Sequence, residues 1–588
     1  MRSLWSREDS GNAIPATAHY TRIYPLLLLG IALSLTKLYL LEIRSREFLD
    51  CQWCVSAPAT ANELQFVVLI GLLVTAAGLP RQRPLRVGLR VVVVAIVVIM
   101  ILDLGVFYQF LQRFTLHRLL KFGSEVTAID DFLKIALSET QTALMALGAL
   151  IVTLTIFGRF LTYDYLFGPR KMLPAVFSVC LVGTQFLESD EFHTPYLLNS
   201  VEAFFAPYTR FQPYSEDFKE AIRAMPSEPQ YCVAGQGERP NLILLVVESL
   251  SMYQSSLYSG IKDWVPQFDN TSRAGRRYSA FYANGVTTEQ GLISLLTGEP
   301  AVEKGVEGNT EFDEFRSTPQ TIPRMLGGLG YRTEFLTTGN LGFLKKGDWL
   351  KNIGFEYVEG HDAHYYDGMK RYHFDAAPDD ALYGRALQEL QSKSGSPIFM
   401  MLETVTTHHP YVEPATGKHS QEAAFRYADQ QLGKFVDALK QRKFFSNGYL
   451  MIVGDHRAMV PMIPEEKRLF GDRGFARIPF TIVGHAMQGQ NEPKMFSQTD
   501  LLPSLRHWIG TGQQCFNPNQ GIFLPNPIHP PACIFTHRSY NFDNVFVHCG
   551  NEDHVIKLDG DRTRFATSNG GSPELIEEVH RLRAGLTW

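Results

Sequence analysis

The sequence has no excess of charge of either sign and no basic stripe. Among its 588 residues, 55 Lys and Arg side chains nearly balance 60 Asp and Glu side chains, which leaves a net charge of -5. A protein that binds nucleic acid through its phosphates concentrates Lys and Arg on one face or in one segment. The composition therefore argues against nucleic acid as a partner.

Cysteine is also scarce, with seven residues in the whole chain. Cys51 and Cys54 form a single C-x-x-C motif, which lacks both the βαβ context of a thioredoxin-like redox site and the second pair of a zinc site. A local disulfide or free thiols are the remaining interpretations. Four further cysteines lie in the second part of the chain: Cys232, Cys515, Cys533 and Cys549. We expect some pairing among these four if they lie outside the cytoplasm, but the spacing leaves the connectivity open.

Long apolar runs are confined to the first 190 residues. A membrane-spanning helix needs about 20 predominantly apolar residues, and five stretches come close to this length: Ile23–Leu41, Leu64–Leu79, Val87–Phe110, Thr142–Phe160 and Met172–Leu187. The first run is too long for a signal peptide and no small-residue cleavage site follows it, so it predicts an anchor that is retained. We therefore predict about five transmembrane helices.

The basic residues of the short loops predict the orientation of these helices. Positive charges precede the first span and lie between the second and third and between the fourth and fifth spans: Arg2, Arg7, Arg81, Arg83, Arg86, Arg170 and Lys171. Cytoplasmic loops carry such an excess, so we expect everything after Leu187 to lie outside the cytoplasm. Lys37 falls within the first span, where it either snorkels to the surface or faces the bundle and a lipid headgroup.

Three domains follow from this division. Residues 1–190 form the transmembrane anchor, 191–236 a periplasmic linker with amphipathic helices, and 237–588 a globular domain. In the globular domain, short apolar runs such as Asn241–Val247, Pro397–Glu403, Tyr449–Val453 and Pro479–Gly484 alternate with helical stretches. Continuous apolar runs are typical of strands buried on both faces. The alternation therefore predicts an α/β fold with a doubly wound sheet.

Groups that can bind a metal follow three of these strands. Glu248 comes directly after the first strand, His408 lies in the segment after the second, and Asp455 and His456 come after the third. Ligands bind at the carboxyl ends of strands in such sheets. Carboxylate and imidazole form a ligand set that manganese or zinc accepts. The joint placement predicts a metal site at this edge.

A short predicted helix supplies a hydroxyl group. The run Glu289–Thr297 reads as a helix that ends at Gly298, with Thr288 at its amino end. Free amide hydrogens and the helix dipole favour a phosphate there. Thr288 is also a common type of helix N-cap, and both roles place its hydroxyl at the helix start.

The segment Thr288–Gly298 resembles the sulfatase signature, which closes in Leu-Leu-Thr-Gly. Sulfatases need Cys or Ser at the position of Thr288, whereas threonine is the nucleophile of the phospho-transferring branch of the alkaline phosphatase superfamily. Thr404–Pro410 resembles that branch's T-x-x-x-H-x-P, which implies that His408 contacts substrate. Asp455-His456 is similar to its metal-binding pair, and Gly339–Gly354 looks most like the glucan phosphoglycerol transferases.

This resemblance implies a membrane enzyme of the phosphoglycerol transferase and lipoteichoic acid synthase type. It assigns Thr288 as the nucleophile and as a metal ligand. It implies that Asn340, Lys346 and His408 bind the substrate. Glu248, Asp455 and His456 complete the metal site. Because Ser249 follows Glu248 where the superfamily carries further acids, we expect one divalent metal, with Mn²⁺ ahead of Zn²⁺ or Mg²⁺. Thr287 would replace Thr288 if the alignment shifts by one residue.

The implied reaction moves phosphoglycerol from phosphatidylglycerol to a periplasmic glycan or glycolipid through a phospho-threonine intermediate. The implied location is a bacterial inner membrane, with the catalytic domain in the periplasm. Transfer of phosphoethanolamine from phosphatidylethanolamine is one alternative. A second is a sulfatase-like, lipid-binding envelope regulator without catalytic activity. Two sequence features depart from the family pattern: Arg457 follows His456, where Gly or an aromatic residue is commoner, and Asn340 replaces an Asp.

Overall fold

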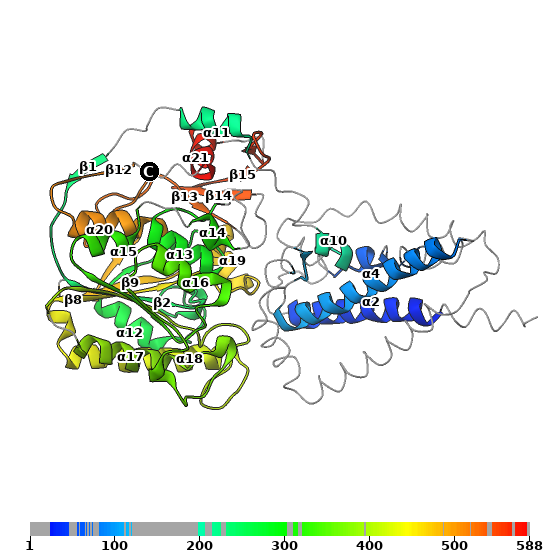
Figure 1. Cartoon of the computed structure of the whole chain (residues 1–588), viewed down its shortest axis with the longest axis horizontal. Coiled ribbons are helices and arrows are strands. Elements are labelled where there is room, and N and C mark those ends of the chain that lie inside the picture. The colour runs from blue at the N-terminus through cyan, green and yellow to red at the C-terminus, as the bar shows by residue number, and fades with distance from the viewer. Residues whose placement is uncertain are drawn as a thin grey trace, which may run out of the picture. The chain divides into compact units, whose positions relative to one another are not determined.

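The chain divides into two compact units. The computed structural model describes residues 24–45, parts of 56–73, 82–110, 113–116, 119, 198–205, 214–224, 231–302, 310–315, 320–392, 395–485, 487, 489–517, 519–537, 544–566 and 571–584. The first unit comprises Met1–Thr115 and Lys134–Ala206, and the second comprises Leu116–Leu133 and Pro207–Trp588. Figure 1 labels the helices and strands of both units.

The first unit is helical where it is described. Its helices are α2 (Tyr24–Ser45), α4 (Arg83–Phe110) and α10 (Ser200–Phe205). Among the described residues, one helix is long and apolar enough to cross a membrane, at Val87–Phe107 within α4. The predicted span Ile23–Leu41 falls largely within α2. The predicted span Leu64–Leu79 is described only in part, and Thr142–Phe160 and Met172–Leu187 lie outside the described residues.

Buried charges join the segments of this unit. Lys37 on α2 is 3% exposed and forms an ion pair with Glu63, which is 2% exposed. Arg113 and Asp103 form a second buried pair, with Nη2 2.6 Å from Oδ2. Both cations also donate to the carbonyl oxygen of Leu198, at 2.7 and 2.6 Å. Lys37 therefore faces the bundle, but it meets protein acceptors there and does not snorkel.

A mixed eight-stranded sheet forms the centre of the second unit. In spatial order its strands are β10 (Gln490–Glu492), β3 (Arg276–Tyr278), β9 (Phe480–Gly484), β8 (Gly448–Gly454), β2 (Asn241–Val247), β7 (Ile398–Glu403), β5 (Arg332–Thr337) and β6 (Tyr357–Glu359). The strands from β8 to β6 are parallel, whereas β9 runs antiparallel to β8 and to β3. The apolar run of β9 predicted its burial correctly but carries no information about its direction.

Helices cover both faces of the sheet, as predicted for this α/β fold (Figure 1). The helices of one face are α12 (Pro266–Ala274), α17 (Asp379–Ser392) and α18 (Gln421–Gln441). The helices of the other face are α13 (Thr288–Thr297), α15 (Ile322–Gly328), α16 (Lys346–Asn352) and α20 (Leu501–Ile509). Alternate residues of β2 point to opposite faces of the sheet. Leu242 and Leu244 lie in the core on one face, and Ile243 and Leu245 lie in the core on the other face. Burial on both faces explains the continuous apolar run of this strand.

Smaller sheets complete the second unit. They consist of β1 (Tyr231–Ala234) with β12 (Gln513–Phe516), β4 (Phe281–Tyr282) with β11 (Phe496–Ser497), and β13 (Ile534–Thr536), β14 (Asn544–Cys549), β15 (Glu552–Lys557) and β16 (Arg564–Phe565). The predicted pairing among the four cysteines takes the form of two disulfides, Cys232–Cys515 and Cys533–Cys549. The first joins β1 to β12 at paired positions.

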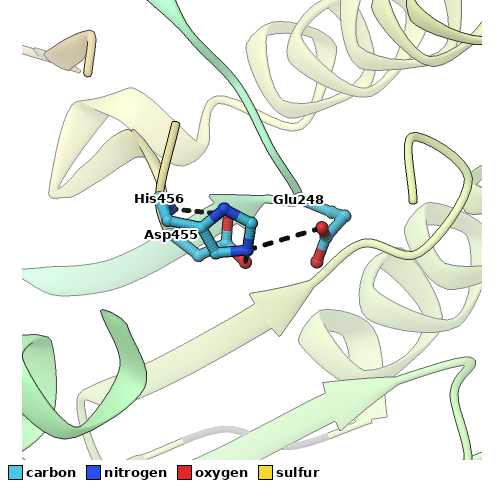
Figure 2. Close-up of side chains that lie close together, drawn as sticks. All are labelled: Glu248, Asp455 and His456. Atoms are coloured by element: carbon cyan, nitrogen blue, oxygen red, sulfur yellow. Dashed lines mark hydrogen bonds and ion pairs between the residues drawn. The ribbon is translucent and has the colours of Figure 1, made fainter. Parts of the chain in front are cut away.

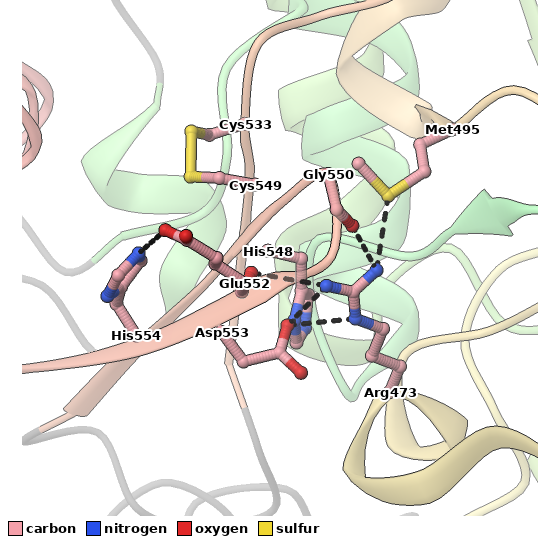
Figure 3. The surroundings of a disulfide bond; sticks show 9 residues. All are labelled: Arg473, Met495, Cys533, His548, Cys549, Gly550, Glu552, Asp553 and His554. Carbon is pink, nitrogen blue, oxygen red and sulfur yellow. Dashed lines mark hydrogen bonds and ion pairs between the residues drawn. A yellow bond between two sulfur atoms is a disulfide. The ribbon is translucent and has the colours of Figure 1, made fainter. Parts of the chain in front are cut away.

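The β14–β15 hairpin is held by one arginine beside the second disulfide (Figure 3). Arg473 donates to Asp553 at 2.8 Å and to the carbonyl oxygens of Gly550 at 2.7 Å and Glu552 at 3.1 Å. Asp553 also accepts from His548 at 2.7 Å. Burial acts to raise the pKa of the Asp553 carboxyl, but these hydrogen bonds outweigh it and lower the pKa to about 2. This network ties the C-terminal sheet to the segment that follows α19 (Pro464–Phe470).

The end of the predicted linker packs against the C-terminal helix. The helix α11 (Glu216–Arg223) follows Tyr214, whose hydroxyl lies 2.6 Å from Nδ1 of His580 on α21 (Pro573–Arg583). The Arg583 guanidinium lies 4.1 Å from the centre of the Tyr214 ring. This part of the linker thus belongs structurally to the second unit.

Candidate active site

The carboxyl ends of β2 and β8 bring three metal-binding side chains together. The two strands are parallel neighbours that pair Val247 with Gly454, so the residues that follow, Glu248 and Asp455, emerge side by side. One ligand atom from each of Glu248, Asp455 and His456 lies within 4.8 Å of the others, and all three residues are buried. Figure 2 shows the two carboxylates and the imidazole facing one another.

The hydrogen bonds of these groups fit a cation between them. Nδ1 of His456 lies 2.8 Å from the Arg457 carbonyl oxygen, to which it donates, so Nε2 keeps its lone pair. Nε2 is 3.2 Å from Oδ2 of Asp455 and 3.7 Å from Oε1 of Glu248. Oδ2 of Asp455 is buried and accepts no hydrogen bond from the described residues. Lone pairs that face one another in this way form the donor set of a divalent metal.

The electrostatics of the cluster point the same way. Burial raises the pKa of Asp455 to about 7, and the Glu248 carboxylate acts in the same direction. Burial opposes protonation of His456, but the carboxylates of Asp455 and Glu248 outweigh it and raise the pKa of this imidazole. The shift of Asp455 arises first from burial and then from Glu248, whereas that of His456 arises from the two carboxylates. A divalent cation supplies positive charge and favours the deprotonated ligands.

The helix α13 directs Thr288 at this cluster. Thr287 is the N-cap, because its hydroxyl accepts from the Gln290 amide at 3.4 Å, so the cap predicted at Thr288 is wrong by one residue. The Thr288 hydroxyl is 3.2 Å from Oε2 of Glu248 and 3.4 Å from Nε2 of His456. The helix approaches closely because Gly291 has no side chain: a Cβ there would lie 2.3 Å from the Asp455 carbonyl oxygen.

Hydroxyl groups that the sequence did not mark as functional hold Glu248 in place. Ser249 donates its hydroxyl to Oε1 of Glu248 and its amide to Oδ1 of Asp455, both at 2.8 Å. The Glu248 amide donates to the Thr404 hydroxyl at 3.0 Å, and the Thr407 hydroxyl donates to the Glu248 carbonyl at 2.6 Å. Ser249 adopts a left-handed backbone with φ of 59°. Such a conformation is unfavourable for a residue with a side chain and is often found at functional sites.

Two predicted substrate residues make intramolecular contacts. Lys346 pairs with Glu403, at the end of β7, across 2.5 Å, and the two side chains are 13% and 4% exposed. The Asn340 carboxamide oxygen accepts from the Gly342 amide at 2.8 Å, which closes a turn.

His408 lies in the segment between β7 and α18, which also carries Thr404 and Thr407. Its Nδ1 is 2.5 Å from the His409 carbonyl oxygen, so the neutral ring carries its lone pair on Nε2. Burial lowers the pKa of His408 to about 4, and the positive charge of Lys346 acts in the same direction. The imidazole is therefore neutral near pH 7, in the form that accepts a proton.

Asp379 supports the same segment and yields a pH-dependent prediction. Its Oδ1 accepts from the amides of Val405 and Thr406, both at 3.1 Å, while Oδ2 is buried with no hydrogen bond in the described part of the chain. Burial raises its pKa from 3.8 to about 6. The folded state therefore binds a proton that the unfolded state has lost between about pH 4 and pH 6, and the free energy of unfolding falls as pH rises through this window.

The variant Asp379→Asn removes this titration and retains an oxygen for both amides. We expect the free energy of unfolding of the variant, relative to that of the native protein, to rise between pH 4 and pH 6. The rise is up to about 1.4 kcal/mol for each pH unit between the unfolded and folded pKa of Asp379. Urea unfolding at pH 4.5 and pH 7 measures the difference. An equal difference at the two pH values would contradict the prediction.

Comparison with known proteins agrees with this geometry. The sulfatase family model matches residues 240–511. Phosphoglycerol transferase I of Xanthomonas campestris pv. campestris (strain B100) is 24% identical over 254 residues, which cover 39% of this chain and 36% of that protein. Lipoteichoic acid synthase of Staphylococcus aureus (strain bovine RF122 / ET3-1) is 23% identical over 310 residues, covering 48% and 47%. The chain thus matches between a third and a half of the length of these relatives.

Solved structures also match part of this chain. A protein in the alkaline phosphatase superfamily from Vibrio parahaemolyticus has a TM-score of 0.48 and 20% identity, covering 63% of this chain and 93% of that one. The family match contains every residue of the site described above, from Glu248 to His456. Residues 240–511, less than half of this chain, therefore resemble the sulfatase family.

Proposed function

We propose that this protein transfers the phosphoglycerol headgroup of phosphatidylglycerol to a hydroxyl of a periplasmic glycan or glycolipid. The observation that carries the proposal is the Thr288 hydroxyl, at the amino end of α13 and within 3.4 Å of two groups of the candidate metal site. Threonine cannot be converted to the formylglycine of sulfatases. A hydroxyl placed here suits a nucleophile that forms a phosphoryl ester.

In the first half of the reaction, Oγ1 of Thr288 attacks the phosphorus of the phosphodiester. The bond from phosphorus to the diacylglycerol oxygen breaks, and diacylglycerol leaves with a proton. Glu248, Asp455 and His456 would hold one divalent cation, with Mn²⁺ first and Zn²⁺ or Mg²⁺ as alternatives. When bound, the cation lowers the pKa of the threonine hydroxyl and offsets phosphoryl charge. The amides at the start of α13 favour the phosphate group.

In the second half, an acceptor hydroxyl attacks the phosphorus and the bond to Thr288 breaks. The acceptor loses a proton and Oγ1 of Thr288 regains one. His408 would contact the phosphate or the acceptor hydroxyl through Nε2, which keeps a lone pair in the neutral imidazole. Lys346 and Asn340 would contact the phosphate or headgroup. Lys346 would bind the substrate phosphate while its ammonium group remains paired with Glu403.

Membrane attachment is part of the proposal. A lipid donor requires a catalytic domain held at the surface that presents the headgroup. The apolar segment Val87–Phe107 supports an anchor. The disulfides Cys232–Cys515 and Cys533–Cys549 support a periplasmic location, since disulfides persist in oxidising compartments. We infer a multi-pass protein of a bacterial inner membrane.

Purified protein in detergent with Mn²⁺ tests the proposal. Phosphatidylglycerol and phosphatidylethanolamine are supplied separately, and diacylglycerol release is measured. Release from phosphatidylglycerol alone is the expected result. Release from phosphatidylethanolamine alone would assign phosphoethanolamine transfer. If a metal-loaded sample that also contains an acceptor cleaves neither lipid, the proposed chemistry is wrong and a lipid-binding envelope regulator is the remaining alternative.

A further inference from the structure

A second histidine lies against His408. His373 belongs to a short 3-10 turn, His373–Asp375, that precedes α17, and it is 8% exposed. Its ring centre lies 5.5 Å from that of His408, with 35° between the ring planes. Phe374 presents its ring at 86° to the His408 ring from 4.7 Å. Two consecutive side chains thus contact the His408 imidazole.

The hydrogen bond of His373 is made to the segment that carries His408. Its Nε2 lies 3.0 Å from the Val405 carbonyl oxygen and donates to it. Its Nδ1 is buried and accepts no hydrogen bond within the described residues. Burial lowers the pKa of His373 to about 3, so the ring remains neutral beside His408. An uncharged hydrogen bond therefore links the turn His373–Asp375 to the segment that carries His408.

The backbone of the turn supports a role at the site. Phe374 and Asp375 have φ of 55° and 54°, in the left-handed region that residues with side chains rarely adopt. Leu344 and Lys345, directly before Lys346, share this feature, as does Tyr411, three residues after His408. Such conformations persist where the surrounding structure enforces them, commonly at functional sites.

We propose that His373 is a positioning residue for His408. It holds the segment after β7 through the Val405 carbonyl and fixes one side of the His408 ring, so that Nε2 of His408 is directed at the acceptor hydroxyl. This inference rests on the proposed function and deepens it. It predicts that loss of His373 slows the second half of the reaction and spares the first. His373 makes these contacts to Val405 and His408, and it is neither a metal ligand nor the nucleophile.

Two substitutions of His373 distinguish the effect of losing its hydrogen bond from the effect of losing folded structure. His373→Phe keeps a ring and loses the donor to Val405. His373→Gln places an amide nitrogen where Nε2 stands and can keep that donor. His537→Phe is the matched control, because His537 is also buried, bonds a carbonyl oxygen (Asn544, 3.3 Å), and lies outside the site. All three variants are made in the full-length protein, with thermal unfolding measured alongside.

The reaction is followed with phosphatidylglycerol as donor and octyl glucoside as acceptor. The initial burst of diacylglycerol and the mass of the phosphoglycerol-protein intermediate report the first half, and the steady-state rate reports the second. For His373→Phe we expect an unchanged burst and accumulated intermediate. The kcat and the KM for the lipid should both fall by about 10- to 100-fold, because kcat/KM for the donor depends on the first half alone. His373→Gln should restore most of the rate, and His537→Phe should match the native protein per folded molecule.

Several results would overturn the inference. They are equal loss of burst and steady-state rate in His373→Phe, no rescue by glutamine, or the same kinetic defect in His537→Phe. Failure of the proposed function is distinguishable, because the native protein itself would then form no intermediate and release no diacylglycerol.

Discussion

Replacing Thr288 with alanine is expected to abolish diacylglycerol release, with a loss of about 1000-fold or more, as for other removed nucleophiles. The hydroxyl faces Glu248 and His456, whereas the backbone of α13 is capped by Thr287. Its loss therefore removes the reacting atom without removing the helix cap. Release of diacylglycerol and the mass of a covalent intermediate measure the effect, and the melting temperature should change little.

Thr287→Ala is the matched control, since it removes a hydroxyl from the adjacent residue. This variant loses the cap hydrogen bond to Gln290, which costs about 1 kcal/mol of stability. It should be less stable but should still form the intermediate. Activity in Thr288→Ala together with inactivity in Thr287→Ala would move the nucleophile to Thr287.

Removal of the metal is expected to cause the second large effect. Dialysis against EDTA should eliminate turnover and lower the melting temperature, because the buried carboxylates of Glu248 and Asp455 then lack the charge that holds them together. Metal at 100 times its dissociation constant stabilises the folded state by about 2.7 kcal/mol. Addition of Mn²⁺, Zn²⁺ or Mg²⁺ to separate samples then identifies the ion that restores both properties.

Asp455→Asn tests whether this stabilisation arises at the proposed site. The substitution removes one ligand charge, and asparagine still offers an oxygen to the amides of Ser249 and His456 that bond Asp455 Oδ1. We expect a folded protein whose melting temperature no longer responds to Mn²⁺. A full response in this variant would place the metal elsewhere.

The strand ends could be predicted from sequence because their signal is local. The apolar run Asn241–Val247 matches β2 residue for residue. Once the sheet is known, parallel neighbours place Glu248 beside Asp455 without further information. The direction of β9 was not predictable, because burial on two faces leaves the same apolar run in either direction.

Pairing between distant segments could not be read from the sequence. Arg457 departs from the family pattern beside a candidate ligand, yet its guanidinium turns away and binds the Glu466 carboxylate through Nε at 2.9 Å and Nη2 at 2.7 Å. Its role is structural, and no local pattern around either residue indicates the other. The same holds for His373, which shares no motif with His408 and meets it only through the fold.

The Cys232–Cys515 disulfide encloses the whole family match in a covalent loop. The two residues are paired across β1 and β12 and are separated by 283 positions along the chain. A protease that cuts once inside the loop leaves the two fragments joined. Tension applied between the preceding linker and the C-terminal sheet passes directly across the sulfur atoms. The central sheet and the candidate active site lie outside that path, so a pull on the segment before Cys232 need not deform the geometry of the site.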